Sequence, residues 1–191
     1  TALDTSVLRG RTMINIDSDD VGVFTVGCAG GMRSDLTLPI ERSACILQAY
    51  EIVISGLAGG HSGAEIDKGR ANATKLMGEF LSSLSGIRIC DLHGGKADNA
   101  IPRECVAVVC AAADPSGAAA DFLAAMRERY GDVEPDMKIT VRETAASLPM
   151  TAESTGRAIK LITSVPDGVI AMSTDIPGLV QTSLNLGITE T

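Results

Sequence analysis

Aromatic side chains are scarce in this chain of 191 residues: they make up 3% of the sequence, and tryptophan is absent. Hydrophobic residues nevertheless reach 45%, so the core must be built from Ala, Val, Ile, Leu and Met. Such a composition is typical of helices packed on a sheet and does not suit an aromatic-rich binding surface. A chain of this length can bury the core of one domain with some additional segments.

Clusters of Lys and Arg are missing as well. The formal net charge is −8, and phosphate binding depends on clustered basic residues, so the composition argues against nucleic acid as a partner. No apolar run approaches the roughly 20 residues that a membrane span needs. No positively charged and then apolar signal segment opens the chain. We therefore expect neither a nucleic-acid partner nor a membrane partner.

Paired cysteines are also lacking. The five cysteines are an odd number without Cys-x-x-Cys spacing, and Cys90, Cys105 and Cys110 lie in apolar, strand-like runs. This pattern favours reduced, buried thiols over disulfides or zinc ligands, and it places the protein in a reducing cytoplasm. No histidine or other base accompanies a cysteine in the sequence, so a thiol nucleophile is not expected.

Apolar periodicity predicts an α/β chain whose main elements follow the order β-α-β-β-α-β. The expected strands are 51–56, 87–92, 105–112 and 137–141, and the expected helices are 70–84 and a second beginning near 116. This is the order of the ferredoxin-like fold, an antiparallel sheet with both helices on one face. An extra helix at 152–164 and a last strand at 180–188 are expected beyond it. The apolar side of that strand should face a core, and its polar side could line a cleft.

Two glycine-rich loops follow strand-like runs, at 59–63 and at 94–102. The glycines around His61 carry no Cβ, so its imidazole can project into open space. A functional histidine and an exposed loop histidine without a role both fit this pattern. Asn99 lies in the second loop, where its amide either donates to a substrate carboxylate or closes an Asx turn. The other histidine, His93, directly follows a strand and is expected to be structural.

An acidic cluster at 17–20 follows a short strand predicted at 13–16, and further short strands are expected at 23–26 and 36–38. Asp17 stands at the end of its strand, where open α/β sheets present ligand-binding side chains. Its carboxylate can hold a metal or cap the following turn. The capping role is favoured on spacing alone, because a metal site needs several converging ligands that the chain does not visibly supply.

Taken together, these stretches resemble the aminoacylhistidine (Xaa-His) dipeptidases, which are carnosinase-like di-zinc metallopeptidases. The resemblance spans essentially the whole chain, and the segments 15–31, 56–66, 99–104 and 180–187 provide it. It implies a cytosolic hydrolase of dipeptides such as carnosine, with two zinc ions in a catalytic domain and a smaller lid domain. The implied domains are residues 1–31, a flanking piece of the catalytic domain, and residues 32–191, the lid and dimerisation domain.

The resemblance also implies roles for single residues. Asp17 matches an aspartate that ligates zinc, His61 matches a lid histidine that stabilises the oxyanion, and Asn99 matches a lid asparagine near the substrate carboxylate. Relatives place an arginine on the strand after the Asn-x-Ile-Pro turn, whereas residues 105–113 contain none, so Arg103 or a later arginine is the candidate substitute. The remaining metal ligands and the general base have no counterpart here. They are expected before the first residue and after the last.

Two functions are therefore considered. In the favoured one, the chain is the lid region of a zinc-dependent Xaa-His dipeptidase that forms a homodimer through the lid. The chain alone should then neither hydrolyse dipeptides nor bind zinc tightly. In the alternative, it is a non-catalytic α/β module that self-associates through a sheet edge.

Overall fold

The computed structural model describes residues 6, 9–12, 14, 21–23 and 29–191. Contacts within the chain divide it into residues 1–34 and residues 35–191. Asp17 and most of the short strands predicted near it lie outside the described residues, and the assignment of residues 1–31 to a catalytic domain stays a prediction. None of the described helices is long and apolar enough to cross a membrane.

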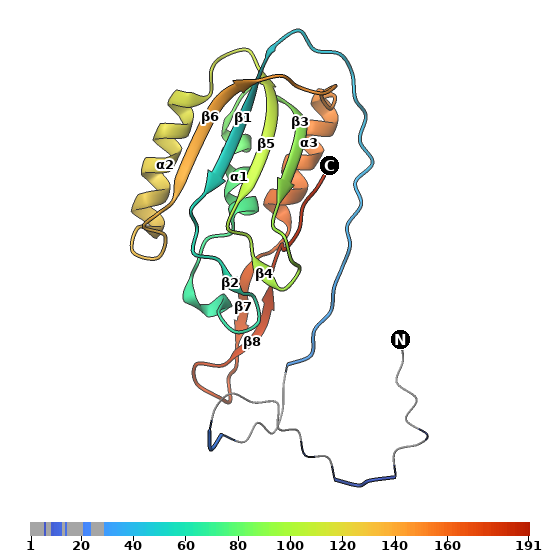
Figure 1. Ribbon diagram of the computed structural model, residues 1–191, viewed down its shortest axis with the longest axis vertical. Helices are drawn as coiled ribbons and strands as arrows, with labels where there is room; N and C mark the ends of the chain where they lie inside the picture. Colours follow the sequence, from blue (N-terminus) through green and yellow to red (C-terminus); the bar gives the residue numbers. More distant parts are fainter. Residues whose placement is uncertain (1–5, 7–8, 13, 15–20, 24–28) are drawn as a thin grey trace. The chain divides into compact units, whose positions relative to one another are not determined.

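A four-stranded antiparallel sheet forms the centre of residues 35–191 (Figure 1). Its strands are β1 (Gln48–Ser55), β3 (Arg88–Gly94), β5 (Cys105–Ala111) and β6 (Lys138–Thr144), in the spatial order β3-β5-β1-β6. Helix α1 (Ala73–Ser83) precedes β3, and helix α2 (Ser116–Tyr130) precedes β6. The predicted ferredoxin-like arrangement is confirmed. The predicted strand at 36–38 is wrong, because those residues adopt no regular structure.

Alternation along the strands decides which face of the sheet is buried. In β5, Cys105, Ala107 and Val109 are buried in the main core, whereas Val106 between them is partly exposed. In β1, alternate residues Ile52 and Ile54 are fully buried in the same core. Complete burial of such a side chain contributes about 1.5–3 kcal/mol. The helices therefore cover one face, as the period-two pattern predicts.

Helix α1 begins where Asn72 caps it. The Asn72 Oδ1 accepts from the backbone N–H groups of Thr74 (3.0 Å) and Lys75 (3.3 Å). The helix thus starts three residues later than the periodicity predicts, since the cap rather than the apolar stripe fixes its first turn. Phe80 of this helix contacts Phe122 of α2, with ring centroids 5.3 Å apart.

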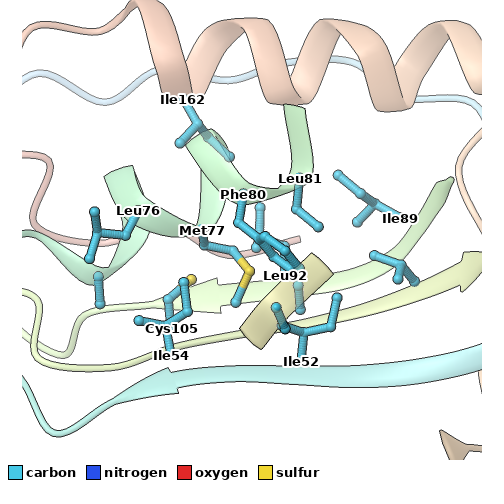
Figure 2. Packing of buried hydrophobic residues seen from close by; sticks show 14 of the residues in the cluster. Ile52, Ile54, Leu76, Met77, Phe80, Leu81, Ile89, Leu92, Cys105 and Ile162 are labelled. Atoms are coloured by element: carbon cyan, nitrogen blue, oxygen red, sulfur yellow. The ribbon is translucent and has the colours of Figure 1, made fainter. Parts of the chain in front are cut away.

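A third helix, α3 (Ala152–Ser164), adds a further layer at the bounds that the sequence predicts. Figure 2 shows α1 between the strands and α3, with Ile162 of α3 directed at α1. Gly78 permits this close approach, because a Cβ at that position would lie 2.6 Å from Ile162 Cγ2. Lys75 of α1 donates from Nζ to the carbonyls of Ile162 (2.6 Å), Thr163 (3.0 Å) and Val165 (2.6 Å) at the end of α3.

The last predicted strand is corrected in extent and partner. Among the described strands, β8 (Val180–Leu184) pairs only with β7 (Gly168–Met172), and both are largely exposed. Its apolar residues therefore do not face a core, with Leu184 45% exposed. The chain leaves the strand before Gly187 because residues beyond it pair elsewhere: Gly94 and Thr189 exchange backbone hydrogen bonds of 2.9 Å.

Among the described cysteines, all four are free thiols. Cys90, Cys105 and Cys110 are buried free thiols, as predicted, whereas Cys45 is only partly buried. The Sγ atoms of Cys90 and Cys110 lie 3.5 Å apart on the sheet face opposite the main core. Cys28 lies outside the described residues.

Candidate active site

The two glycine-rich loops meet in a short antiparallel ladder. His61 belongs to β2 (Gly60–His61), which pairs with β4 (Ala100–Ile101) in the register His61↔Ala100. The backbone N–H of Ser62 also donates to the Asn99 carbonyl at 2.9 Å. The structure therefore brings together two motifs that are far apart in the sequence. They lie at one end of the main sheet in Figure 1.

The His61 imidazole is exposed, and its orientation is fixed by its own loop. The Gly63 N–H donates to His61 Nδ1 at 3.0 Å. A neutral imidazole that accepts at Nδ1 must carry its proton on Nε2. A Cβ at Gly63 would lie 3.1 Å from the ring Cε1, so a larger residue would crowd this contact. The neutral ring therefore has its N–H donor at Nε2.

Glu65 holds the backbone of His61, and the sequence argument assigned it no role. Its Oε2 accepts from the His61 N–H at 3.0 Å, while Oε1 lies 2.9 Å from Lys68 Nζ and 3.0 Å from Arg70 Nη2. Lys68, then the His61 N–H and Arg70, lower the pKa of Glu65 from 4.5 to about 2. The carboxylate is therefore ionised at any pH at which the protein would work. In the sequence, the signal for this role was a glutamate followed within five residues by two cationic side chains, Lys68 and Arg70.

Arg103 braces the opposite side of the loop. Its Nε donates to the Leu57 carbonyl at 2.9 Å, and its aliphatic stem lies against Gly59. Gly59 has a φ of +63°, and a Cβ there would overlap the Arg103 side chain. The hydrogen bond occupies only Nε, and no other hydrogen bond or ion pair of this guanidinium occurs among the described residues. Its terminal nitrogens remain able to bind a carboxylate in the bidentate manner of arginine.

A cleft of about 760 Å³ connects these groups. His61, Asn99 and Arg103 all line it, together with His93, the glycine pair 94–95 and further residues of both loops. The Asn99 and Arg103 residues are exposed, as is His61. The other histidine is paired, with 3.2 Å between His93 Nε2 and Asp91 Oδ2. The three residues selected from the sequence on the lid side therefore share one cavity.

Glu134 is a second residue that sequence reasoning missed. Its side chain is buried, and it accepts from the backbone N–H groups of Ala58 (2.6 Å) and Ala71 (2.9 Å). The carboxylate thereby ties the segment before His61 to the start of α1. It lies in a turn before β6, where neither periodicity nor spacing marks it. Only the three-dimensional fold shows this role.

The described residues contain no group of three or more His, Cys, Asp or Glu side chains that could hold a metal ion. The predicted zinc ligand Asp17 lies outside the described residues. The structure in hand therefore supplies a donor-lined cleft, and it offers no metal centre within the part it describes.

Comparison with known proteins gives relatives for this chain. Residues 52–138 match the family model described as the peptidase dimerisation domain of the M20 group. A curated relative, the cytosol non-specific dipeptidase of Escherichia coli (strain K12), is 33% identical over 195 residues, covering 95% of this chain and 39% of the relative. The crystal structure of aminoacylhistidine dipeptidase from Vibrio alginolyticus matches with a TM-score of 0.76 at 32% identity, covering 81% of this chain and 34% of that one.

These findings first indicate a class: residues 52–138, which lie in the ferredoxin-like domain of this chain, match the M20 peptidase dimerisation domain. The chain is similar in particular to dipeptidases, since both relatives are dipeptidases and match it over most of its length. It spans about 39% of the length of the curated relative and 34% of the crystallised one.

Proposed function

We propose that this chain forms the lid and dimerisation part of a metal-dependent dipeptidase, to which it contributes His61, Asn99 and Arg103. One observation supports the proposal most directly: His61 accepts at Nδ1 from Gly63, which leaves the Nε2–H as its donor, and His61 lines a cleft together with Asn99 and Arg103. Both dipeptidase relatives support the reaction class.

In this proposal His61 stabilises developing negative charge. Attack on a peptide carbonyl produces a tetrahedral oxyanion, and a preorganised N–H donor stabilises that state more than the substrate. The Gly63 contact and the Glu65 bond to the His61 backbone preorganise the imidazole before substrate binds. Asn99 and the free end of Arg103 are assigned to the terminal carboxylate of the dipeptide.

The proposed cofactor is zinc, two ions in the intact enzyme, with Asp17 as one ligand. When bound, paired metal ions polarise the scissile carbonyl and activate water. The described residues do not form such a site by themselves. The proposal places the other ligands and the general base in polypeptide outside this chain. Besides Asp17, it assigns this chain substrate-side tasks. A reducing cytoplasm remains the proposed compartment.

Substrate preference is proposed from the crystallised relative, which is an aminoacylhistidine dipeptidase, whereas the curated relative is named non-specific. We propose Xaa-His dipeptides of the carnosine type as substrates. Comparison of kcat/KM for β-Ala-His, Ala-His and Ala-Ala tests this. A preference of tenfold or more for the histidine peptides supports it, and equal values contradict it.

The decisive variant is His61→Ala in the intact enzyme. Loss of one oxyanion donor commonly lowers turnover by about 10²–10³, and we expect kcat to fall by that factor while metal content stays unchanged. His93→Ala is the matched control, because this second histidine pairs with Asp91 in the same cleft. It should change kcat by only a few fold. Unaltered kinetics in His61→Ala would remove His61 from the mechanism and leave self-association as the function of the domain.

A further inference from the structure

The Asn185 side chain holds the turn that contains Asn99. Its Nδ2 donates to the carbonyls of Asp98 (3.2 Å) and Ala100 (2.9 Å), the two residues that flank Asn99. Carbonyl oxygens only accept, so two such partners establish which end of the amide is nitrogen. One side chain therefore holds the carbonyl groups of the two residues that flank Asn99.

The same turn also contacts the His61 loop. Ala100 pairs with His61 in the β2–β4 ladder, and the Asn99 carbonyl accepts from the Ser62 N–H at 2.9 Å. A displacement of this turn would move the Asn99 amide and the strand partner of His61 together. Asn185 does not line the cleft itself, so it acts on the site indirectly, through this turn.

The segment around Asn185 is itself anchored. The Leu186 N–H donates to Asp167 Oδ1 at 2.8 Å, and Asn72 Nδ2 donates to the Leu186 carbonyl at 3.1 Å. Gly187 packs directly on the loop, where a Cβ would lie 2.8 Å from the Asp98 carbonyl oxygen. The turn is therefore braced against the capped start of α1.

The other end of the Asn185 amide is unsatisfied. Its Oδ1 is buried and has no hydrogen-bond partner among the described residues. Buried polar atoms in proteins are almost always paired, and an exception calls for a reason. Here the orientation in which Nδ2 donates to both turn carbonyls leaves Oδ1 as the unpaired end of the amide.

We propose that Asn185 is a positioning residue for substrate binding: its two hydrogen bonds hold the Asn99 turn, and through it the His61 ladder, in the geometry of the cleft. The kinetic part of this proposal rests on the proposed function. The structural part, that Asn185 immobilises residues 97–101, stands without it.

Three measurements test the proposal. In the unaltered chain, NMR should show slower solvent exchange of the Asn185 side-chain amide than of Gln181, which is exposed in β8. In Asn185→Asp, which replaces the donors by oxygens facing two carbonyls, backbone amides of 97–101 should exchange faster. Kinetics of the intact enzyme should show kcat/KM lowered by about 10–100-fold, mostly through KM, because misplacement of about 1 Å can cost 10²-fold.

Gln181→Glu is the control, since it makes the same amide-to-acid change on the neighbouring strand without a contact to the loop. It should leave the exchange of 97–101 and KM unchanged. Asn185→Ala replaces the aspartate variant if the latter does not fold, and the NMR comparison in the unaltered chain needs no variant. Equal exchange of the two side-chain amides, or unchanged exchange of 97–101 in a folded Asn185 variant, would overturn the proposal.

The kinetic outcome separates the two proposals. A turn that loosens without any change of KM refutes the role of Asn185 in substrate binding. If His61→Ala leaves the kinetics unchanged, the proposed function is refuted. The exchange data then still decide whether Asn185 holds the turn. If His61→Ala lowers kcat as expected but Asn185→Asp leaves the amide exchange of residues 97–101 unchanged, only the proposal for Asn185 is refuted.

Discussion

At the scale of single residues, the Glu65 carboxylate, which holds the His61 backbone, makes the stability of the fold depend on pH. Its folded pKa of about 2 lies below the ordinary 4.5, so the folded state binds the proton less readily than the unfolded state does. The stability that Glu65 contributes is therefore fully present above pH 4.5 and is lost as the pH falls toward 2. Its interactions are partly exposed to solvent, which screens them.

Glu65→Gln should accordingly lower the unfolding midpoint by a constant amount between pH 8 and about pH 5. The difference from the unaltered chain should shrink as the pH falls from 4.5 toward 2, where the native carboxylate also becomes protonated. Thermal unfolding followed by circular dichroism measures this. Asp67→Asn, an exposed acid in the neighbouring 3₁₀ turn (Ile66–Lys68), provides the control. A difference that grows on acidification would contradict the assigned contacts.

The thiols should differ in reactivity at the same scale. Burial raises the pKa of both Cys105 and Cys110 to about 12, and it raises the pKa of Cys90 as well. A thiol with a pKa near 12 is roughly one part in 10⁴ ionised at pH 8, and the thiolate is the reactive species. Among the described thiols, iodoacetamide should therefore modify the partly exposed Cys45 before the other three, as peptide mass spectrometry would show. In guanidinium chloride this difference in labelling rate should vanish. Rapid labelling of Cys105 in the native protein would contradict its burial.

At the scale of elements, Gly78 decides how closely α1 and α3 approach. Alanine is better than glycine inside a helix by about 0.5–1 kcal/mol. At Gly78, however, the added Cβ would lie 2.6 Å from Ile162 Cγ2 and 3.3 Å from its branched Cβ, which cannot rotate away. Overpacking of this kind costs about 1–3 kcal/mol. The clash should outweigh the propensity, so Gly78→Ala should lower the free energy of unfolding by up to about 2 kcal/mol.

Gly156 is the matched control for that prediction. It lies within α3, and a Cβ there meets nothing within 4 Å. Gly156→Ala should therefore raise stability by about 0.5–1 kcal/mol. Urea unfolding of both variants gives the two values. The same sign in both variants would contradict the close packing of α1 on α3.

Elements with long-range periodicity were predictable from sequence, and the site was predictable only in part. The bounds of α3 follow directly from its apolar stripe and from Thr151, whose side chain accepts from the Ser154 N–H. Strand β8 was misplaced because its alternation is equally compatible with an exposed hairpin. The β2–β4 pairing is only two residues long in each strand, too short for any pattern to mark. Glu134 and Asn185 act through contacts with segments distant in the sequence, which no local signal reveals.

At the scale of the whole molecule, the two edges of the main sheet differ. The β3 edge is covered within residues 35–191: the Met150 N–H donates to the Ile89 carbonyl at 2.7 Å, and the Ile89 N–H donates to Thr155 Oγ1 at 3.2 Å. Strand β6, at the other edge, pairs with no described strand except β1. An uncovered edge is a template for pairing with another chain. We expect the homodimer of the dimerisation domain to form through β6.

Proline substitutions in β6 test this expectation. Neighbouring residues in an antiparallel edge strand direct their N–H groups alternately toward the partner strand and away from it, and proline removes the N–H. Of Thr140→Pro and Val141→Pro, the variant that loses the N–H facing β1 should destabilise the fold. The other variant should stay folded but sediment as a monomer, because its missing N–H and its ring block the approach of a second copy. Sedimentation velocity and urea unfolding measured together separate these effects. A folded dimer in both variants would place the interface elsewhere, and a monomeric unaltered chain at about 100 µM would show that this domain alone does not bury the roughly 1,200–2,000 Å² of a stable interface.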